Sequence, residues 1–162
     1  MRGDHFSPDV QELVGLFATH AVRFLLVGGE AVIYHGYPRL TGDVDFWYEQ
    51  TPENVTRLFA ALREFWSGRV PGLEHEGDLL RPNVVVQFGR PPHRVDLVSS
   101  IDGVSFAEAW TSQVHDSLDV ADGSKHPLGV IGLPDLVRNK RAAGRYKDLD
   151  DVEHLEPLLR GG

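Results

Sequence analysis

Residues 23–48 read RFLLVGGEAVIYHGYPRLTGDVDFWY and contain two apolar runs of strand length with a short helical segment between them. The first run stops at Gly28-Gly29, and residues 30–35 then predict a short helix that ends at a further glycine. Pro38 requires an extended or turning connection, because the residue before a proline is disfavoured in the helical region. The second run, DVDFWYE, has the aromatic and β-branched bias of a strand. This stretch therefore predicts a strand, a helix and a second strand in succession.

Apolar periodicity and turn residues predict the elements on either side of this stretch. Helical spacing predicts further helices at 8–20, from 52 to near 68, at about 105–112, and over about 133–160 with a break near Gly144. The remaining strand-like runs are NVVVQFG (83–89), HRVDLVS (93–99), VHDSLDV (114–120) and HPLGVIG (126–132). The expected fold class is α/β (α+β), a mixed β-sheet of five or six strands flanked by helices, with a C-terminal helical segment.

Size and composition limit the class of protein. The chain has 162 residues, of which 41% are hydrophobic and 25% charged, and we expect a single domain over 1–162. No apolar run approaches the roughly 20 residues that span a bilayer, and the N-terminal residues lack the apolar core of a signal peptide. We therefore expect a cytoplasmic protein without membrane contact. The absence of cysteine excludes disulfides and thiolate zinc sites, and the eight histidines form no HExxH motif.

The charge is negative overall but positive in one segment. A net charge of −8 argues against a general nucleic-acid coat, because neutralising phosphates needs a surplus of Lys and Arg. Residues 138–147 have such a surplus, with five basic residues and no acidic one: Arg138, Lys140, Arg141, Arg145 and Lys147. A polyanion could bind to this basic segment.

Three aspartates are the candidate catalytic acids. Asp43 and Asp45 are two positions apart in a predicted strand, so both side chains point to the same face with Cα atoms roughly 6–7 Å apart. Two such carboxylates can converge on a hard cation. Asp96 lies in the strand-like run HRVDLVS, where an unpaired acid is costly to bury, so it requires a cation or the nearby Arg94. The alternatives are solvated turn residues for the pair, and a surface-facing or arginine-paired acid on an edge strand for Asp96.

Gly28 and Gly29 stand where a predicted strand passes into a helix. Glycine lets the backbone come close to a ligand, and a helix N-terminus offers unpaired N–H groups and a positive dipole end, so phosphate is the natural guest. The sequence has neither the Lys-Ser/Thr of a P-loop nor the GxGxxG spacing of a dinucleotide site. A plain strand-to-helix turn is the alternative reading.

In combination, these motifs resemble the signature of the nucleotidyltransferase superfamily, whose fold is that of DNA polymerase β. In that signature a Gly-rich turn precedes Asp-x-Asp, and a later strand supplies a third acid. The likeness is closer to a small bacterial branch related to the AbiEii-type toxins, whose first motif is matched by Gly28-Gly29, Ala31, Arg39, Thr41, Asp43 and Asp45. A later block of that branch is matched by Lys140, Ala143, Arg145, Lys147-Asp148 and Asp151.

The resemblance implies an enzyme that transfers NMP from NTP to an acceptor hydroxyl with the help of two Mg²⁺ ions. It implies Asp43, Asp45 and Asp96 as metal ligands, with Asp96 also acting as a general base. The nucleotide-binding residues that it implies are Gly28, Gly29, Arg39, Thr41, Lys140, Asp148 and Asp151. Among these, the glycines would cradle the phosphates, and the two basic residues would supply positive charge to them.

One residue departs from the family pattern, and the acceptor is open. Glu30 stands where many relatives have Ser, and it would repel a phosphate if it pointed inward. The AbiEii-like branch implies RNA as the acceptor, such as a tRNA 3′ end, in a toxin setting with an antitoxin protein as partner. The other readings are nucleotidylation of an antibiotic, because an acidic protein suits a cationic aminoglycoside, and a nucleotide-binding module without turnover.

Overall fold

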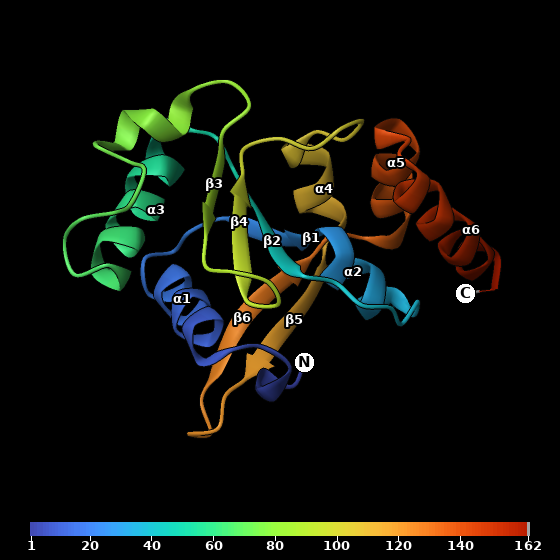
Figure 1. Ribbon diagram of the computed structural model, residues 1–162, viewed down its shortest axis with the longest axis horizontal. Coiled ribbons are helices and arrows are strands. Elements are labelled where there is room, and N and C mark those ends of the chain that lie inside the picture. Colours follow the sequence, from blue (N-terminus) through green and yellow to red (C-terminus); the bar gives the residue numbers. More distant parts are fainter. Residues whose placement is uncertain (162) are drawn as a thin grey trace.

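A computed structural model describes residues 1–161 of the chain (Figure 1). Within these residues six strands form one sheet in the order β3-β4-β2-β1-β6-β5. The strands are β1 (Phe24–Val27), β2 (Asp43–Tyr48), β3 (Val85–Phe88), β4 (Arg94–Val98), β5 (Val114–Asp119) and β6 (Lys125–Val130). The helices are α1 (Pro8–Thr19), α2 (Gly28–His35), α3 (Pro52–Phe65), α4 (Phe106–Ser112), α5 (Leu133–Ala143) and α6 (Tyr146–Gly161). The expected mixed α/β sheet with flanking helices and a C-terminal helical segment is confirmed.

Capping residues set where the two long N-terminal helices begin. The Ser7 hydroxyl caps α1, and the Thr51 hydroxyl caps α3, each by accepting a backbone N–H three residues later. A proline follows each cap, in the first helical position, where its missing N–H costs nothing. Two 3₁₀ turns, Gly3–His5 and Glu76–Leu80, lie in segments for which the sequence predicts no regular structure.

Glycines in positive-φ conformations stand at two of the helix boundaries. Helix α2 begins at Gly28, two residues earlier than expected, because Gly28 takes a φ of 67° and turns the chain into the helix directly after β1. Gly144, with a φ of 66°, ends α5 as predicted. The chain resumes as a helix at Tyr146 rather than near residue 148.

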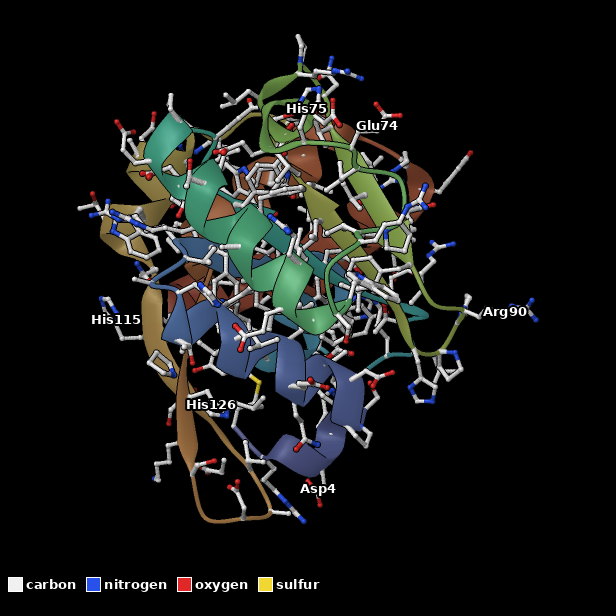
Figure 2. The ribbon with its side chains drawn as sticks, turned by 90° about the vertical axis from the view of Figure 1, so that its left-hand side faces the viewer. Asp4, Glu74, His75, Arg90, His115 and His126 are labelled. Atoms are coloured by element: carbon white, nitrogen blue, oxygen red, sulfur yellow. The ribbon has the colours of Figure 1, made fainter. Side chains whose placement is uncertain are left out.

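The central strand β2 presents different side chains to the two faces of the sheet. It pairs with β1 in antiparallel and with β4 in parallel orientation. Phe46 packs edge-on against Phe17 of α1, whereas Trp47 contacts Phe106 of α4 on the opposite face. Figure 2 shows α1 and α3 side by side across the first face. Because side chains alternate along a strand, Asp43 and Asp45 share the face of Trp47, away from α1 and α3.

The core occupies both faces of the central strands. β1 is buried along its whole length, and the largest fully buried side chains of the protein include Phe17, Phe46, Trp47 and Tyr48. None of the helices over residues 1–161 combines the length and apolar character needed to cross a bilayer.

Candidate active site

The three aspartates meet on one face of the sheet. The parallel register of β2 and β4 sets Asp43 opposite Arg94, and Asp45 opposite Asp96. Residues two apart in a strand point the same way, so these four residues form a square on the sheet. Asp43, Asp45 and Asp96 each contribute a carboxylate oxygen to a cluster in which all such oxygens lie within 4.8 Å of one another. Over the described residues this is the one such cluster of three or more acidic or histidine side chains.

The closeness of the carboxylates and their burial raise the pKa values of Asp45 and Asp96. Burial first, and then the charges of Asp96 and Asp43, raise the pKa of Asp45 to about 7. The pKa of Asp96 is also raised, first by burial and then by the charge of Asp43. Asp96 is only 8% exposed, and its Oδ1 atom has no hydrogen-bond partner within residues 1–161. A buried carboxylate oxygen without a donor, beside two further carboxylates, fits a hard divalent cation such as Mg²⁺, which prefers oxygen ligands.

Two glycines bring the N-terminus of α2 against this cluster. A Cβ atom at Gly28 would overlap the Oδ2 atom of Asp45. A Cβ atom at Gly29 would lie 2.6 Å from the Oγ1 atom of Thr41. The Thr41 hydroxyl in turn donates a hydrogen bond to the carbonyl oxygen of Asp43 at 3.3 Å. The positive end of α2 therefore lies next to the three carboxylates, where an anion that accompanies the cation would find unpaired N–H groups.

The cluster opens into a cleft of about 420 Å³. One side of its lining comes from the start of α2 and from β2, β3 and β4, and the other from α5 and the start of α6. Basic side chains lie among the lining residues, namely Arg94, Lys140, Arg145 and Lys147. The cleft thus combines three carboxylates that could hold a cation with positively charged groups, which is the combination that a metal-bound phosphate ester requires.

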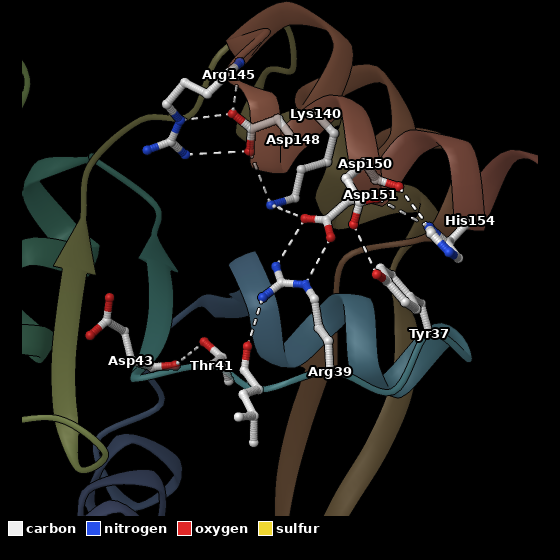
Figure 3. Close-up of polar contacts among 11 residues, drawn as sticks. Tyr37, Arg39, Thr41, Asp43, Lys140, Arg145, Asp148, Asp150, Asp151 and His154 are labelled. Carbon is white, nitrogen blue, oxygen red and sulfur yellow. Dashed lines mark hydrogen bonds and ion pairs between the residues drawn. The ribbon is translucent and has the colours of Figure 1, made fainter.

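The structure separates the predicted nucleotide-binding residues into two groups. Gly28, Gly29, Thr41, Lys140 and Asp148 line the cleft. Arg39 and Asp151 do not, because they bind each other at 2.8 and 2.9 Å through two hydrogen bonds (Figure 3). The physical reason is that Asp151 is only 1% exposed and requires counter-charges in place.

Lys140 belongs to the same ion-pair network. Its Nζ atom lies 3.0 Å from Asp151 and 3.3 Å from Asp148 (Figure 3), and the residue is only 4% exposed. Arg145 donates to Asp148 from its Nε atom at 2.7 Å, while most of its side chain remains exposed. The two aspartates thus hold Lys140 at the edge of the cleft.

Most of the basic segment 138–147 is neutralised locally. Arg138 pairs with Glu108 and Asp135, at 2.9 and 3.1 Å, and Arg141 pairs with Glu156 at 2.6 Å. With Lys140 and Arg145 also paired, Lys147 is the basic residue of this segment that has no ion pair within residues 1–161. The positive surface available to a polyanion is therefore smaller than the sequence predicts.

Comparison with known proteins bears on the fold. No protein-family model and no curated protein sequence matches the chain. An antigenic nucleotidyltransferase-like protein from Paracoccidioides brasiliensis superposes with a TM-score of 0.51 at 19% identity, over 94% of this chain and 78% of that one. The chain has a nucleotidyltransferase-like fold. A candidate nucleotidyltransferase from Thermotoga maritima gives a TM-score of 0.47 at 12% identity, over 94% of this chain and 91% of that one.

Within this nucleotidyltransferase-like fold, the structure shows where the side chain of Glu30 lies, the residue that departs from the family pattern. The Glu30 carboxylate pairs with the His5 ring at 2.6 Å, and Glu30 is not part of the cleft lining. It points away from the three aspartates, toward the N-terminal 3₁₀ turn. The side chain that replaces the usual Ser therefore does not repel an anion in the cleft.

Sequence reasoning missed several residues of the cleft. Gln87 of β3 lies opposite Asp96 in the antiparallel register, and its side chain lowers the pKa of Asp96 against the effect of burial. Asp102 and Asn139 also line the cleft, and the Asn139 amide donates to the Asp102 carbonyl at 2.9 Å. Gln87 could have been noticed in the sequence, because it is one polar residue within a predicted apolar strand. Nothing in the sequence around Asp102 and Asn139 indicates that they line the cleft.

Proposed function

We propose that this protein is a Mg²⁺-dependent nucleotidyltransferase, which moves NMP from NTP to an acceptor hydroxyl. The observation that supports this most directly is the convergence of Asp43, Asp45 and Asp96, with oxygens within 4.8 Å, beside the N-terminus of α2. The nucleotidyltransferase-like fold is consistent with this activity.

Each residue of the cleft then has a role that follows from its position. Asp43, Asp45 and Asp96 would hold Mg²⁺, which when bound neutralises charge that develops on the phosphates. Asp96 would also accept the proton of the acceptor hydroxyl, because its carboxylate lines the cleft and its pKa is raised. The backbone N–H groups at Gly28 and Gly29 would bind phosphate oxygens.

The basic side chains of the cleft would bind and orient the triphosphate. Lys140 is held at the cleft by Asp148 and Asp151, and would attract the phosphates from this fixed position. Arg145 and Lys147 line the same wall with exposed side chains. Arg39, which does not line the cleft, would act indirectly, by holding Asp151 in place.

For the acceptor we favour RNA, in a toxin or defence setting with an antitoxin as partner. This rests on the sequence resemblance to the AbiEii-type branch and on the exposed Arg145 and Lys147 beside the cleft. The competing acceptor is a cationic antibiotic. The further acid in the lining, Asp102, and the net charge of −8 favour that second class.

The test is nucleotidyl transfer with each α-labelled NTP and Mg²⁺, offered total RNA, protein or aminoglycosides as acceptors. We expect label on one acceptor class with the wild type, and a loss of at least about 100-fold in Asp45→Asn. Asp119→Asn is the matched control, because Asp119 is an exposed acid outside the cleft. Transfer by Asp45→Asn at the wild-type rate would refute the proposal. NTP binding by the wild type without product on any acceptor would favour a binding module instead.

A further inference from the structure

A positive charge lies inside the carboxylate cluster. Arg94 is the fourth corner of the square on β2 and β4, directly opposite Asp43 and two residues before Asp96. Its Nη2 atom donates to the Oδ2 atom of Asp43 at 2.7 Å, and its Nε atom lies 3.5 Å from the Oδ1 atom of Asp96. A guanidinium on this corner of the square touches two of the three proposed metal ligands.

We infer that Arg94 is a built-in counter-cation of the cluster, which neutralises Asp43 while the site is free of metal and releases it when divalent ions bind. This inference rests on the proposed function, because it takes the three aspartates as the metal ligands. It assigns Arg94 a positioning role that competes with metal, rather than a direct role in the chemistry.

The charge balance of the cluster supports this role. Three partly buried carboxylates within 4.8 Å of one another repel each other, and one guanidinium reduces that repulsion in the metal-free protein. A divalent ion at the same carboxylates meets repulsion from that guanidinium and competes with it for Asp43. Binding of either cation at Asp43 therefore weakens binding of the other.

Not all donors of the Arg94 side chain are paired, and the side chain has access to solvent through the cleft. The buried Nε atom of Arg94 and the Oδ1 atom of Asp96 face each other at 3.5 Å, and neither has a hydrogen-bond partner within residues 1–161. The Arg94 side chain is 33% exposed and lines the cleft, so it can turn toward solvent there. A purely structural arginine would be expected to satisfy its donors fully.

The deciding measurement is the affinity of the NTP-free protein for Mn²⁺ alone, by titration calorimetry and by electron paramagnetic resonance of free Mn²⁺. We expect Arg94→Gln to bind Mn²⁺ about tenfold more tightly than the wild type, because one like charge next to the ion is removed. Arg94→Lys keeps the charge and is expected to stay within about twofold of the wild type. Arg138→Gln, which removes an arginine paired outside the cleft, is the control and should change nothing.

A purely structural role of Arg94 predicts the opposite change in Mn²⁺ affinity. If Arg94 merely held the aspartates in register, Arg94→Gln would bind Mn²⁺ more weakly, and unchanged or weaker binding overturns the inference. Should Arg94→Gln fail to fold, the wild type decides: the Nε–H resonance of Arg94 must shift on saturation with Mg²⁺, and a resonance that stays in place refutes release. Failure of the wild type to bind Mn²⁺ at all would refute the proposed function itself.

Discussion

Gly28 shows how one missing side chain shapes the site. Its φ of 67° and its contact with Asp45 are two separate demands for glycine, because an L side chain is strained at this φ and its Cβ atom would overlap the Asp45 carboxylate. Gly144 meets only the first demand, since its φ is 66° and the nearest atom to a Cβ there is 3.6 Å away. The two glycines therefore separate backbone strain from contact with the site.

We predict that Gly28→Ala lowers the free energy of unfolding by more than Gly144→Ala does. Strain at positive φ costs both variants about 1–2 kcal/mol, and Gly28→Ala must in addition displace Asp45. Urea unfolding measures the stabilities, and Mn²⁺ titration measures the site. Gly28→Ala should weaken Mn²⁺ binding, while Gly144→Ala leaves it as in the wild type. Equal effects of the two variants on both quantities would show that the contact with Asp45 has no importance.

The Asp45 carboxyl is partly buried and lies close to two other carboxyls, and both conditions favour its protonated form. Its pKa is raised to about 7 in the folded protein, against about 3.9 in an unfolded chain. A raised pKa means that the folded state binds the proton more tightly. The stability that this group contributes is complete below the unfolded pKa and is lost as the pH rises through the folded one.

We therefore compare the free energies of unfolding of Asp45→Asn and of the wild type in the presence of a chelator. We predict that the variant gains stability relative to the wild type when the pH is raised from 5 to 8. The expected difference is on the order of 1 kcal/mol, because the asparagine removes a charge that the folded state tolerates poorly. Denaturant unfolding at both pH values measures it, with Asp119→Asn as the control for the loss of one acid. A difference that is the same at pH 5 and pH 8 would contradict a raised pKa at Asp45.

At the scale of elements, local signals predicted most of the fold. The Ser-Pro and Thr-Pro pairs place the starts of α1 and α3, and the alternation of polar and apolar residues in DVDFWY gives both the strand and the shared face of Asp43 and Asp45. The start of α2 was predicted two residues late, because glycine is a poor helix former within a chain and its positive φ is not visible in sequence.

Contacts between side chains that are far apart in the chain could not be predicted from the sequence. Arg39 and Asp151 are 112 positions apart, and no local pattern shows that they bind each other rather than a ligand. The same holds for Arg94, whose position opposite Asp43 depends on the register between β2 and β4. Charged residues matched to a motif could thus be identified, but whether each faces the cleft or a buried partner depends on the assembled tertiary structure.

The contact between Arg39 and Asp151 joins the segment before β2 to α6, and Asp151 also binds Lys140. We predict that Asp151→Asn lowers the free energy of unfolding by about 3 kcal/mol or more, because it leaves Arg39 without its buried partner and leaves Lys140 with Asp148 alone. Arg39→Gln should cost less, since Asp151 keeps Lys140. Glu156→Gln, at an exposed pair with Arg141, should cost at most about 1 kcal/mol. Chemical denaturation measures all three, and an equal cost for Asp151→Asn and Glu156→Gln would show that the network does not hold α6 in place.

Across the whole molecule, the proposed metal site joins strands at the centre of the sheet. Asp45 and Asp96 come from β2 and β4, which pair in parallel although 51 positions separate the two residues. A ligand bound to both strands stabilises every part of the protein that unfolds together with them. The melting temperature of the entire chain is therefore a readout of the site, and this readout requires neither nucleotide nor acceptor.

We predict that MgCl₂ raises the melting temperature of the wild type. At a concentration 100 times the dissociation constant, the expected stabilisation is about 2.7 kcal/mol, or several degrees for a domain of this size. NaCl at equal ionic strength separates specific binding from screening of the net charge of −8. Asp43→Asn and Asp45→Asn should lose most of the rise, while Asp119→Asn keeps it. A rise of the same size in all variants would place the Mg²⁺ elsewhere, and it would leave the three carboxylates without the ion on which the proposed activity depends.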